Sequence, residues 1–147
     1  MGKYVLPFLF TVLVDISPFG IHSHPILDEL TYKDHLSVEF IGSASLLSPV
    51  DGRIKEVQSV SSLFSEKMVI TIESLHESEL TISLTSMYDD LYVSPDDIVD
   101  KGDTIALLKN YTDSIYLLSI KTDFHHTAVD PSSYFPALNY MNFIMVR

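Results

Sequence analysis

The chain has 147 residues, of which 46% are hydrophobic and 20% charged, a balance typical of one globular domain rather than a disordered segment. Its formal net charge of −11 would repel a phosphate backbone, so we expect no nucleic-acid partner. Cysteine is absent, which excludes disulfides, thiolate metal ligands and cysteine nucleophiles.

An apolar run from Tyr4 to Val14 follows Lys3 near the beginning of the sequence. A positive residue before a short apolar core is typical of a secretory signal, and the run is too short to span a bilayer, which takes about 20 residues. The same residue types also suit a buried strand. We favour a signal peptide or N-terminal anchor over residues 1–23, and therefore expect an exported or envelope-associated protein with membrane attachment through the N-terminus as one alternative.

Residues 16–33 contain Pro18, Gly20 and Pro25 among polar residues, which is typical of an irregular segment. We therefore predict a lead-in segment over residues 24–34. A single β domain is expected to follow over residues 35–147.

Short apolar runs separated by turns recur through this domain. In one of them Leu80, Ile82 and Leu84 alternate with Thr81 and Ser83, which is the period of a strand with one buried face. No window shows a helical period bounded by caps. The predicted fold is all-β, a sandwich or closed barrel of short strands. Strands are expected at 36–42, 52–60, 66–74, 78–88 and 114–122, the last of them central because its apolar residues are nearly continuous.

Four aromatic residues lie close to the C-terminus. We expect them to pack in the core or against a sheet edge, and consider an exposed platform for sugar or peptide the weaker alternative. They are Tyr134, Phe135, Tyr140 and Phe143.

Three turn motifs then occur in a recognisable order. They are "SPVDGRI" with Pro49, Asp51, Gly52 and Ile54; "VSPDDIVDKGDTI" with Val93, Asp97, Val99, Gly102 and Ile105; and "VDPSSY" with Val129, Asp130, Pro131 and Tyr134. This order resembles the lysostaphin- and LytM-like zinc metallopeptidases, which cut peptide cross-bridges in bacterial peptidoglycan. The resemblance covers residues 35–135 and implies the duplicated hybrid motif fold, a barrel-sandwich hybrid of mostly antiparallel strands. Asp96 stands where the family has the first glycine of the second motif.

In that family zinc is bound by a His-x-x-x-Asp pair and by the second histidine of a late His-x-His. Here His35 and Glu39 have the spacing of the first pair, but Ile115 and Leu117 stand at the His-x-His and Met87 near another catalytic histidine. Zinc catalysis needs three protein ligands and a base. We therefore predict no catalytic residue and no cofactor, and retain His35 and Glu39 only as vestigial candidates for a weak zinc site. A chance pair of a surface histidine and a strand glutamate is the more frequent explanation.

The remaining histidines do not occupy the family's positions. His125 and His126 follow the last expected strand, His22 and His24 lie in the lead-in region, and His76 is expected in a hairpin turn. Short histidine-rich stretches of this kind are usually solvated loops.

Three functions are compatible with these observations. The leading one, implied by the resemblance, is a non-catalytic LytM-like domain that acts in the bacterial envelope as a regulator or scaffold and binds peptidoglycan or a partner hydrolase, because groove shape does not depend on zinc. The second is an active zinc metallopeptidase with displaced ligands, using His35, Glu39 and either His125 or His126. The third is a domain similar to the phosphocarrier IIA proteins, which need two histidines on neighbouring strands.

Overall fold

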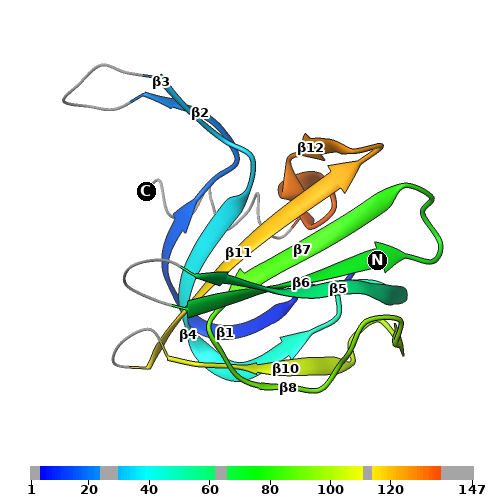
Figure 1. Ribbon diagram of the computed structural model, residues 1–147. Coiled ribbons are helices and arrows are strands. Elements are labelled where there is room, and N and C mark those ends of the chain that lie inside the picture. Colours follow the sequence, from blue (N-terminus) through cyan, green and yellow to red (C-terminus); the bar gives the residue numbers. More distant parts are fainter. Residues whose placement is uncertain (1–3, 24–29, 62–65, 111–113, 137–147) are drawn as a thin grey trace.

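The computed structural model describes residues 4–23, 30–61, 66–110 and 114–136. These residues form one large curled sheet, one small two-stranded sheet and a single 3-10 turn (Figure 1). The predicted all-β architecture is confirmed, since the large sheet bends into an antiparallel half-barrel. Within the described ranges, no helix has the length and apolar character needed to cross a membrane.

The strands follow the turn signals of the sequence closely. Their bounds are β1 Phe8–Ser17, β2 Gly20–Ser23, β3 Leu30–Lys33, β4 Leu36–Leu47, β5 Gly52–Ser61, β6 Glu66–Ser74, β7 Leu80–Ser86, β8 Tyr88–Leu91, β9 Ile98–Val99, β10 Thr104–Leu108, β11 Ile115–Phe124 and β12 Thr127–Val129, followed by the 3-10 turn η1 Pro131–Ser133.

The large sheet has the order β8-β10-β4-β11-β7-β6-β5-β9, and β1 and β12 pair with β4 and β11 outside this path. Strand β4 is long enough to pair with β10 near its end and with β11 near its start, while β1 runs along its other edge. Strand β11 lies between β4 and β7, which confirms its predicted central position.

Alternation along each strand separates the core from a polar face. On β7 the apolar residues Leu80, Ile82 and Leu84 are fully buried, whereas Thr81 and Ser83 point to the other face and are half-buried. Each fully enclosed side chain of this size stabilises the fold by about 1.5–3 kcal/mol. The core therefore fills the inside of the half-barrel and leaves the polar face of β4, β11, β7 and β6 available.

The first two turn motifs are held together by backbone hydrogen bonds. Ser48 N–H donates to Asp103 O at 2.8 Å, and Gly102 N–H donates to Ser48 O at 2.8 Å. The Asp51 carboxylate accepts from Lys101 N–H at 2.8 Å and lies 3.0 Å from His76 Nε2. The pKa of Asp51 is lowered mainly by the hydrogen bond from Lys101 N–H and further by the bond with His76. The sharp turn at residues 49–52 therefore joins β5 to the corner before β10.

Backbone conformation accounts for the replaced glycine of the second motif. Asp96 has φ +77° and Gly102 has φ +93°, both in the left-handed region that glycine adopts without strain. The Asp96 carboxylate receives a hydrogen bond from Arg53, which also pairs with Glu73.

Residues 8–14 of the N-terminal apolar run lie in strand β1, but most of this strand is exposed and not buried as the alternative interpretation expected. Phe8 and Ile16 are buried in the core. Gly42 on β4 admits this strand, since a Cβ there would lie 2.2 Å from the carbonyl oxygen of Leu9 and 2.6 Å from the Cα of Phe10. The interpretation of residues 1–23 as a signal peptide remains a prediction.

The segment expected to be an irregular lead-in is partly regular. Strand β3 pairs with β2, with Gly20 opposite Lys33 and Ser23 opposite Leu30, so a two-stranded hairpin projects from the half-barrel (Figure 1). Residues 24–29 lie outside the described part of the chain.

The third motif closes the described part of the domain. Asp130 caps η1 by accepting from Ser132 N–H at 3.0 Å. Phe135 is buried, and the rings of Tyr134 and Phe135 lie 5.4 and 6.1 Å from that of Tyr4. Of the four C-terminal aromatics, these two pack as expected. Tyr140 and Phe143 lie outside the described residues.

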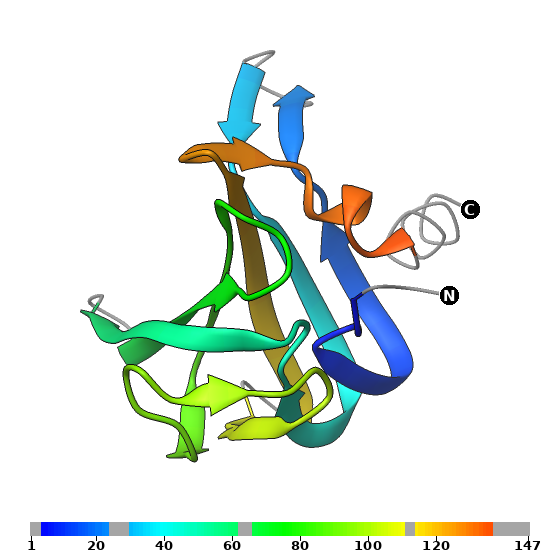
Figure 2. The same ribbon diagram turned by 90° about the vertical axis from the view of Figure 1, so that its right-hand side faces the viewer.

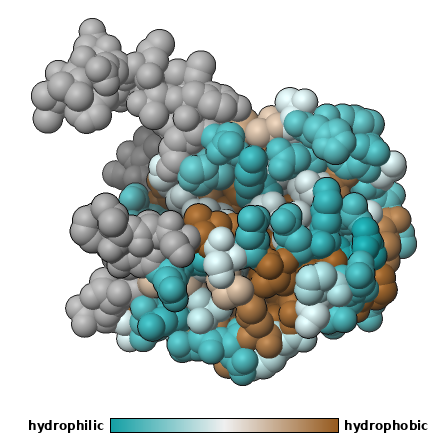
Figure 3. Space-filling view, in the orientation of Figure 1, coloured by the Kyte–Doolittle hydropathy of each residue, from teal (hydrophilic) through white to brown (hydrophobic). Residues whose placement is uncertain are grey.

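The surface in Figure 3 differs in character across one face. Hydrophobic residues gather in its lower half, where β1, β5, β8 and β10 lie, and hydrophilic residues cover the upper right, where β12 and η1 lie. Figure 2 shows β1 beside β4 at the margin of the curled sheet.

Candidate functional site

Residues of β5, β6, β7 and β11 line the candidate site, and β4 lies beside β11. Cross-strand register brings Ser37 of β4 opposite Ser119 of β11, and their hydroxyl oxygens lie 3.2 Å apart. On β6 and β7, Thr71 and Ser83 are opposite each other at the same hydroxyl distance of 3.2 Å. These small hydroxyl side chains leave room above the sheet.

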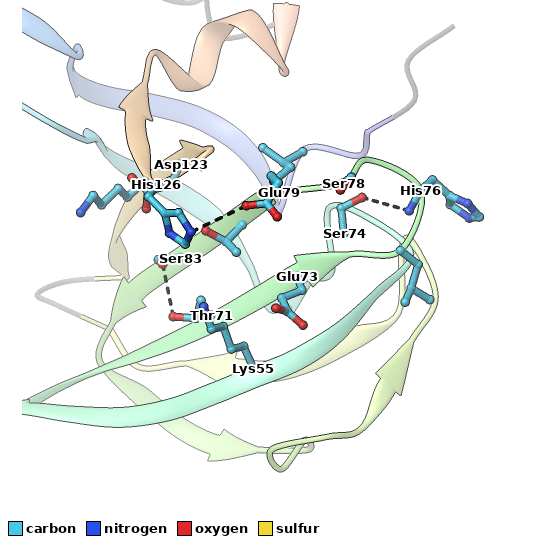
Figure 4. A pocket seen from close by; sticks show the side chains of 14 residues that line it. Lys55, Thr71, Glu73, Ser74, His76, Ser78, Glu79, Ser83, Asp123 and His126 are labelled. Atoms are coloured by element: carbon cyan, nitrogen blue, oxygen red, sulfur yellow. Dashed lines mark hydrogen bonds and ion pairs between the residues drawn. The ribbon is translucent and has the colours of Figure 1, made fainter.

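An open groove of about 780 Å³ lies above this face, toward the β6–β7 turn and the β11–β12 turn. Lys55, Lys121, Glu73, Glu79 and Asp123 give it charges of both signs. Figure 4 shows Thr71, Ser83 and Glu79 lining the groove, while the ring of His76 points away from it at one end.

The β11–β12 turn forms one wall with an unusual backbone. The backbone φ angles of His125 and His126 are 53° and 64°, in the left-handed region that few residues other than glycine adopt. The turn is tied to the β6–β7 turn, because His125 N–H donates to Glu79 O at 3.0 Å and His126 Nε2 lies 3.7 Å from the Glu79 carboxylate.

The first vestigial candidate, His35, lies in the bend immediately before β4. Its Nδ1 is 3.0 Å from Asp34 Oδ1, and Lys121 Nζ is 3.4 Å from the other Asp34 oxygen. The hydrogen bond with His35, and secondarily the Lys121 ammonium, lower the pKa of Asp34. The imidazole thus has an acidic partner and a cation close to that partner.

The second candidate, Glu39, lies on β4 between two pairing strands. It is opposite Leu117 on β11 and opposite Asp15 on β1. Ile115 is opposite Ile41 in the same ladder. Leu117, which is predicted to stand where the family has a ligand histidine, therefore lies next to Glu39.

His125 is not brought to this place, and His24 lies outside the described residues. His125 follows Leu117 by eight residues, which corresponds to roughly 26 Å along an extended strand. Zinc ligands bind at about 2.0–2.3 Å and so must converge on one point. In the part of the chain that the structure describes, no three His, Asp or Glu side chains are grouped to hold a metal.

The residues that the structure describes therefore do not fit a catalytic zinc. His35 and Glu39 supply at most two donors, and an aliphatic side chain stands where the third would be needed. The phosphocarrier arrangement is also not formed by the described strands β4 to β12, none of which contains a histidine.

The charged residues of the groove were not predicted from the sequence. Lys121 and Asp123 continue the outward-facing positions of β11 beyond Ser119, and Lys55 lies at the bulge of β5 opposite β6. The alternation of β11 contained a signal for the first two. The sequence contained no signal for Lys55, because the register shift at the bulge appears only when β5 and β6 pair.

No family model matches this sequence, and no curated protein matches it at a significant level. Solved structures do share its fold. A zinc containing peptidase from Vibrio cholerae has a TM-score of 0.54 and 18% identity over 80% of this chain and 36% of the other. Lysostaphin has a TM-score of 0.59 and 13% identity, over 81% of this chain and 49% of its own. A chain of the SpoIIQ–SpoIIIAH pore forming complex has a TM-score of 0.55 and 11% identity, over 88% of this chain and 92% of its own.

These likenesses establish the lysostaphin-like fold that the turn motifs predicted. The chain spans about a third to a half of the length of the two first-mentioned structures.

Proposed function

We propose that this chain is a non-catalytic lysostaphin-like domain that binds a peptide in its groove without cleaving it. The β4–β11 ladder carries the proposal, because Leu117 lies opposite Glu39. Hydrolysis by zinc requires a third ligand and a base for the water proton. A leucine side chain can provide neither.

The charges of the groove support a peptide ligand. Lys55 and Lys121 can bind carboxylates, and Glu73, Glu79 and Asp123 can bind amines, so a peptide with both kinds of group finds partners along the floor. Hydroxyl groups such as those of Thr71 and Ser83 supply neutral hydrogen bonds. Peptidoglycan stem peptides, which have free carboxylates and amines, have this mixed character.

We further propose that the domain acts in the bacterial cell envelope, as a scaffold or regulator that binds peptidoglycan or a hydrolase of it. The fold supports this, since it is shared with a zinc containing peptidase and with lysostaphin. A chain from a two-protein complex also has this fold, which supports action by binding.

Co-sedimentation with purified insoluble peptidoglycan tests the binding. The Lys121→Glu variant reverses a charge inside the groove, and Lys109→Glu makes the same change on the exposed surface outside it. We expect the wild-type chain and Lys109→Glu to sediment together with peptidoglycan. Lys121→Glu should bind at least fivefold more weakly.

Equal binding by both variants would show that general charge, and not the groove, holds the polymer. No binding by the wild-type chain would contradict a peptidoglycan ligand and favour a protein partner. In every arm we expect no soluble fragments to be released.

A further inference from the structure

Polar residues form a row across the strands that line the groove. The register places Thr71 of β6 opposite Ser83 of β7, and Ser83 opposite Lys121 of β11. Lys55, at the bulge of β5, continues this row beyond Thr71. Adjacent strands lie about 4.8 Å apart, so the curled sheet separates β5 from β11 by at most roughly 14 Å.

A second row lies two residues closer to the β6–β7 turn. It consists of Glu73 of β6, Thr81 of β7 and Asp123 of β11, which are opposite one another in the same ladders. Glu79 precedes Thr81 by two residues and also lines the groove. The carboxylates of the groove therefore belong to this second row and to the turn beside it.

Two of the charged groove residues are already paired within the protein. Lys121 Nζ lies 3.4 Å from Asp34 Oδ2. Glu73 Oε1 lies 2.5 Å from a guanidinium nitrogen of Arg53. These two charges are therefore partly neutralised before a ligand binds.

The charges that remain lie at opposite ends of the groove. Lys55 on β5 and Asp123 on β11 form no ion pair with any residue that the structure describes. Glu79 adds a carboxylate at the β11 end, where the His126 ring is 3.7 Å away, so that end stays negative even when this histidine is protonated. Figure 4 shows the hydroxyl side chains of β6 and β7 between Lys55 and Asp123. The groove is therefore positive at its β5 end and negative at its β11 end.

We propose that the groove binds a short extended peptide in one direction, with a carboxylate at Lys55 and an amino group at Asp123. The peptide crosses β6 and β7, where the Thr71 and Ser83 hydroxyls are available to it. Four extended residues span roughly 13 Å, which matches the separation of β5 from β11. This inference rests on the proposed function, and it gives the ligand a length and a direction.

Tetraalanine is a suitable probe, because its two ends carry its only charges. Titration of the isotope-labelled full-length chain, followed by NMR chemical shifts, measures its affinity and shows which amides it affects. Tetraalanine with two free ends is compared with its N-acetylated and C-amidated forms. Lys55→Gln and Asp123→Asn each remove one charge from the groove, and Lys109→Gln and Asp89→Asn are matched controls at exposed residues outside it.

We expect N-acetylation to weaken binding about threefold in the wild-type chain and in Lys55→Gln. Asp123→Asn should lose most of this effect, because it lacks the partner of the amino group. C-amidation should likewise weaken binding about threefold in the wild-type chain and in Asp123→Asn, and have little effect in Lys55→Gln. Both control variants should behave as the wild-type chain does.

The reversed pattern, or equal affinity for all three forms of the peptide, would overturn the direction and leave peptide binding by the groove intact. An equal loss in the control variants would overturn the proposal as an effect of general charge. Absence of tetraalanine binding in a chain that still sediments with peptidoglycan would overturn this inference alone. Absence of both kinds of binding would contradict the peptide-binding function as well.

Discussion

Leu117 is the residue on which the proposed lack of catalysis depends most directly, since it lies opposite Glu39. Replacement by histidine would restore an imidazole donor there but not the missing base. We expect Leu117→His to lose about 1 kcal/mol of stability, because a half-buried apolar side chain becomes polar. It should release no fragments from peptidoglycan with zinc added.

Calorimetric zinc titration and a fragment-release assay on this variant check both parts. Zinc-dependent cleavage by Leu117→His would show that a competent base lies near Glu39 and residue 117. Leu107→His, a half-buried leucine on β10, is the matched control for the stability loss.

Gly42 is the residue that allows β1 to approach β4. In Gly42→Ala the new methyl group would meet the backbone of Leu9 and Phe10 at 2.2 and 2.6 Å, and backbone cannot move as a side-chain tip does. We expect a loss of about 1–3 kcal/mol in the free energy of unfolding. Urea denaturation measures it, and an unchanged midpoint would mean that β1 is not seated as described.

Asp51 links the two turn motifs through Lys101 N–H and His76. Its pKa is lowered in the folded state, so its stabilising effect is present at neutral pH and is lost as the pH falls through that lowered pKa. We expect Asp51→Ala to have a lower thermal midpoint than the wild-type chain at pH 7. The difference should shrink in acid; a difference constant down to pH 2 would exclude the carboxylate as its cause.

At the scale of elements, period-two alternation predicted the core strands well. The pattern at 66–74 became β6 with the same bounds, and those at 36–42, 52–60 and 114–122 became β4, β5 and β11. Strand pairing could not be read from them, because any strand with one apolar face can pair with any other. The motif order indicated only the fold, and the bonds between residues 48 and 102–103 that join the first two motifs appear in the structure.

The N-terminal strand shows the limit of local patterns. A short apolar run after Lys3 has the same composition whether it is a signal peptide or a strand. Its role depends on a distant glycine, Gly42, and on the core position that Phe8 fills. The candidate site could be predicted only in part for the same reason. Leu117 lies opposite Glu39 because of the register between β4 and β11, which the local sequence does not reveal.

A chain beginning at residue 24 tests the two interpretations of this run. It lacks β1, so Phe8 and Ile16 no longer fill the core, a loss of about 1.5–3 kcal/mol for each side chain. If β1 belongs to the mature fold, the unfolding midpoint should be strongly lowered, and mass spectrometry of the mature protein should detect residues 8–17. A mature N-terminus between residues 20 and 24, with stability intact, would establish cleavage instead.

At the scale of the whole molecule, one strand, β4, lies between the candidate groove and β1. The groove lies over β6, β7 and β11, and the edge of β1 lies beyond β4. Strand β1 does not pair with any strand that lines the groove, so we expect changes in one to have little effect on the other, because sites without shared contacts behave additively.

The most direct test of a binding domain that does not cleave is hydrolysis of pentaglycine and of intact peptidoglycan with zinc added, measured for the wild-type chain and for His35→Ala. We expect no product from either, because the β4–β11 ladder offers Leu117 where the third ligand is needed. Zinc-dependent cleavage by the wild-type chain that His35→Ala abolishes would contradict the account and identify an active metallopeptidase with displaced ligands.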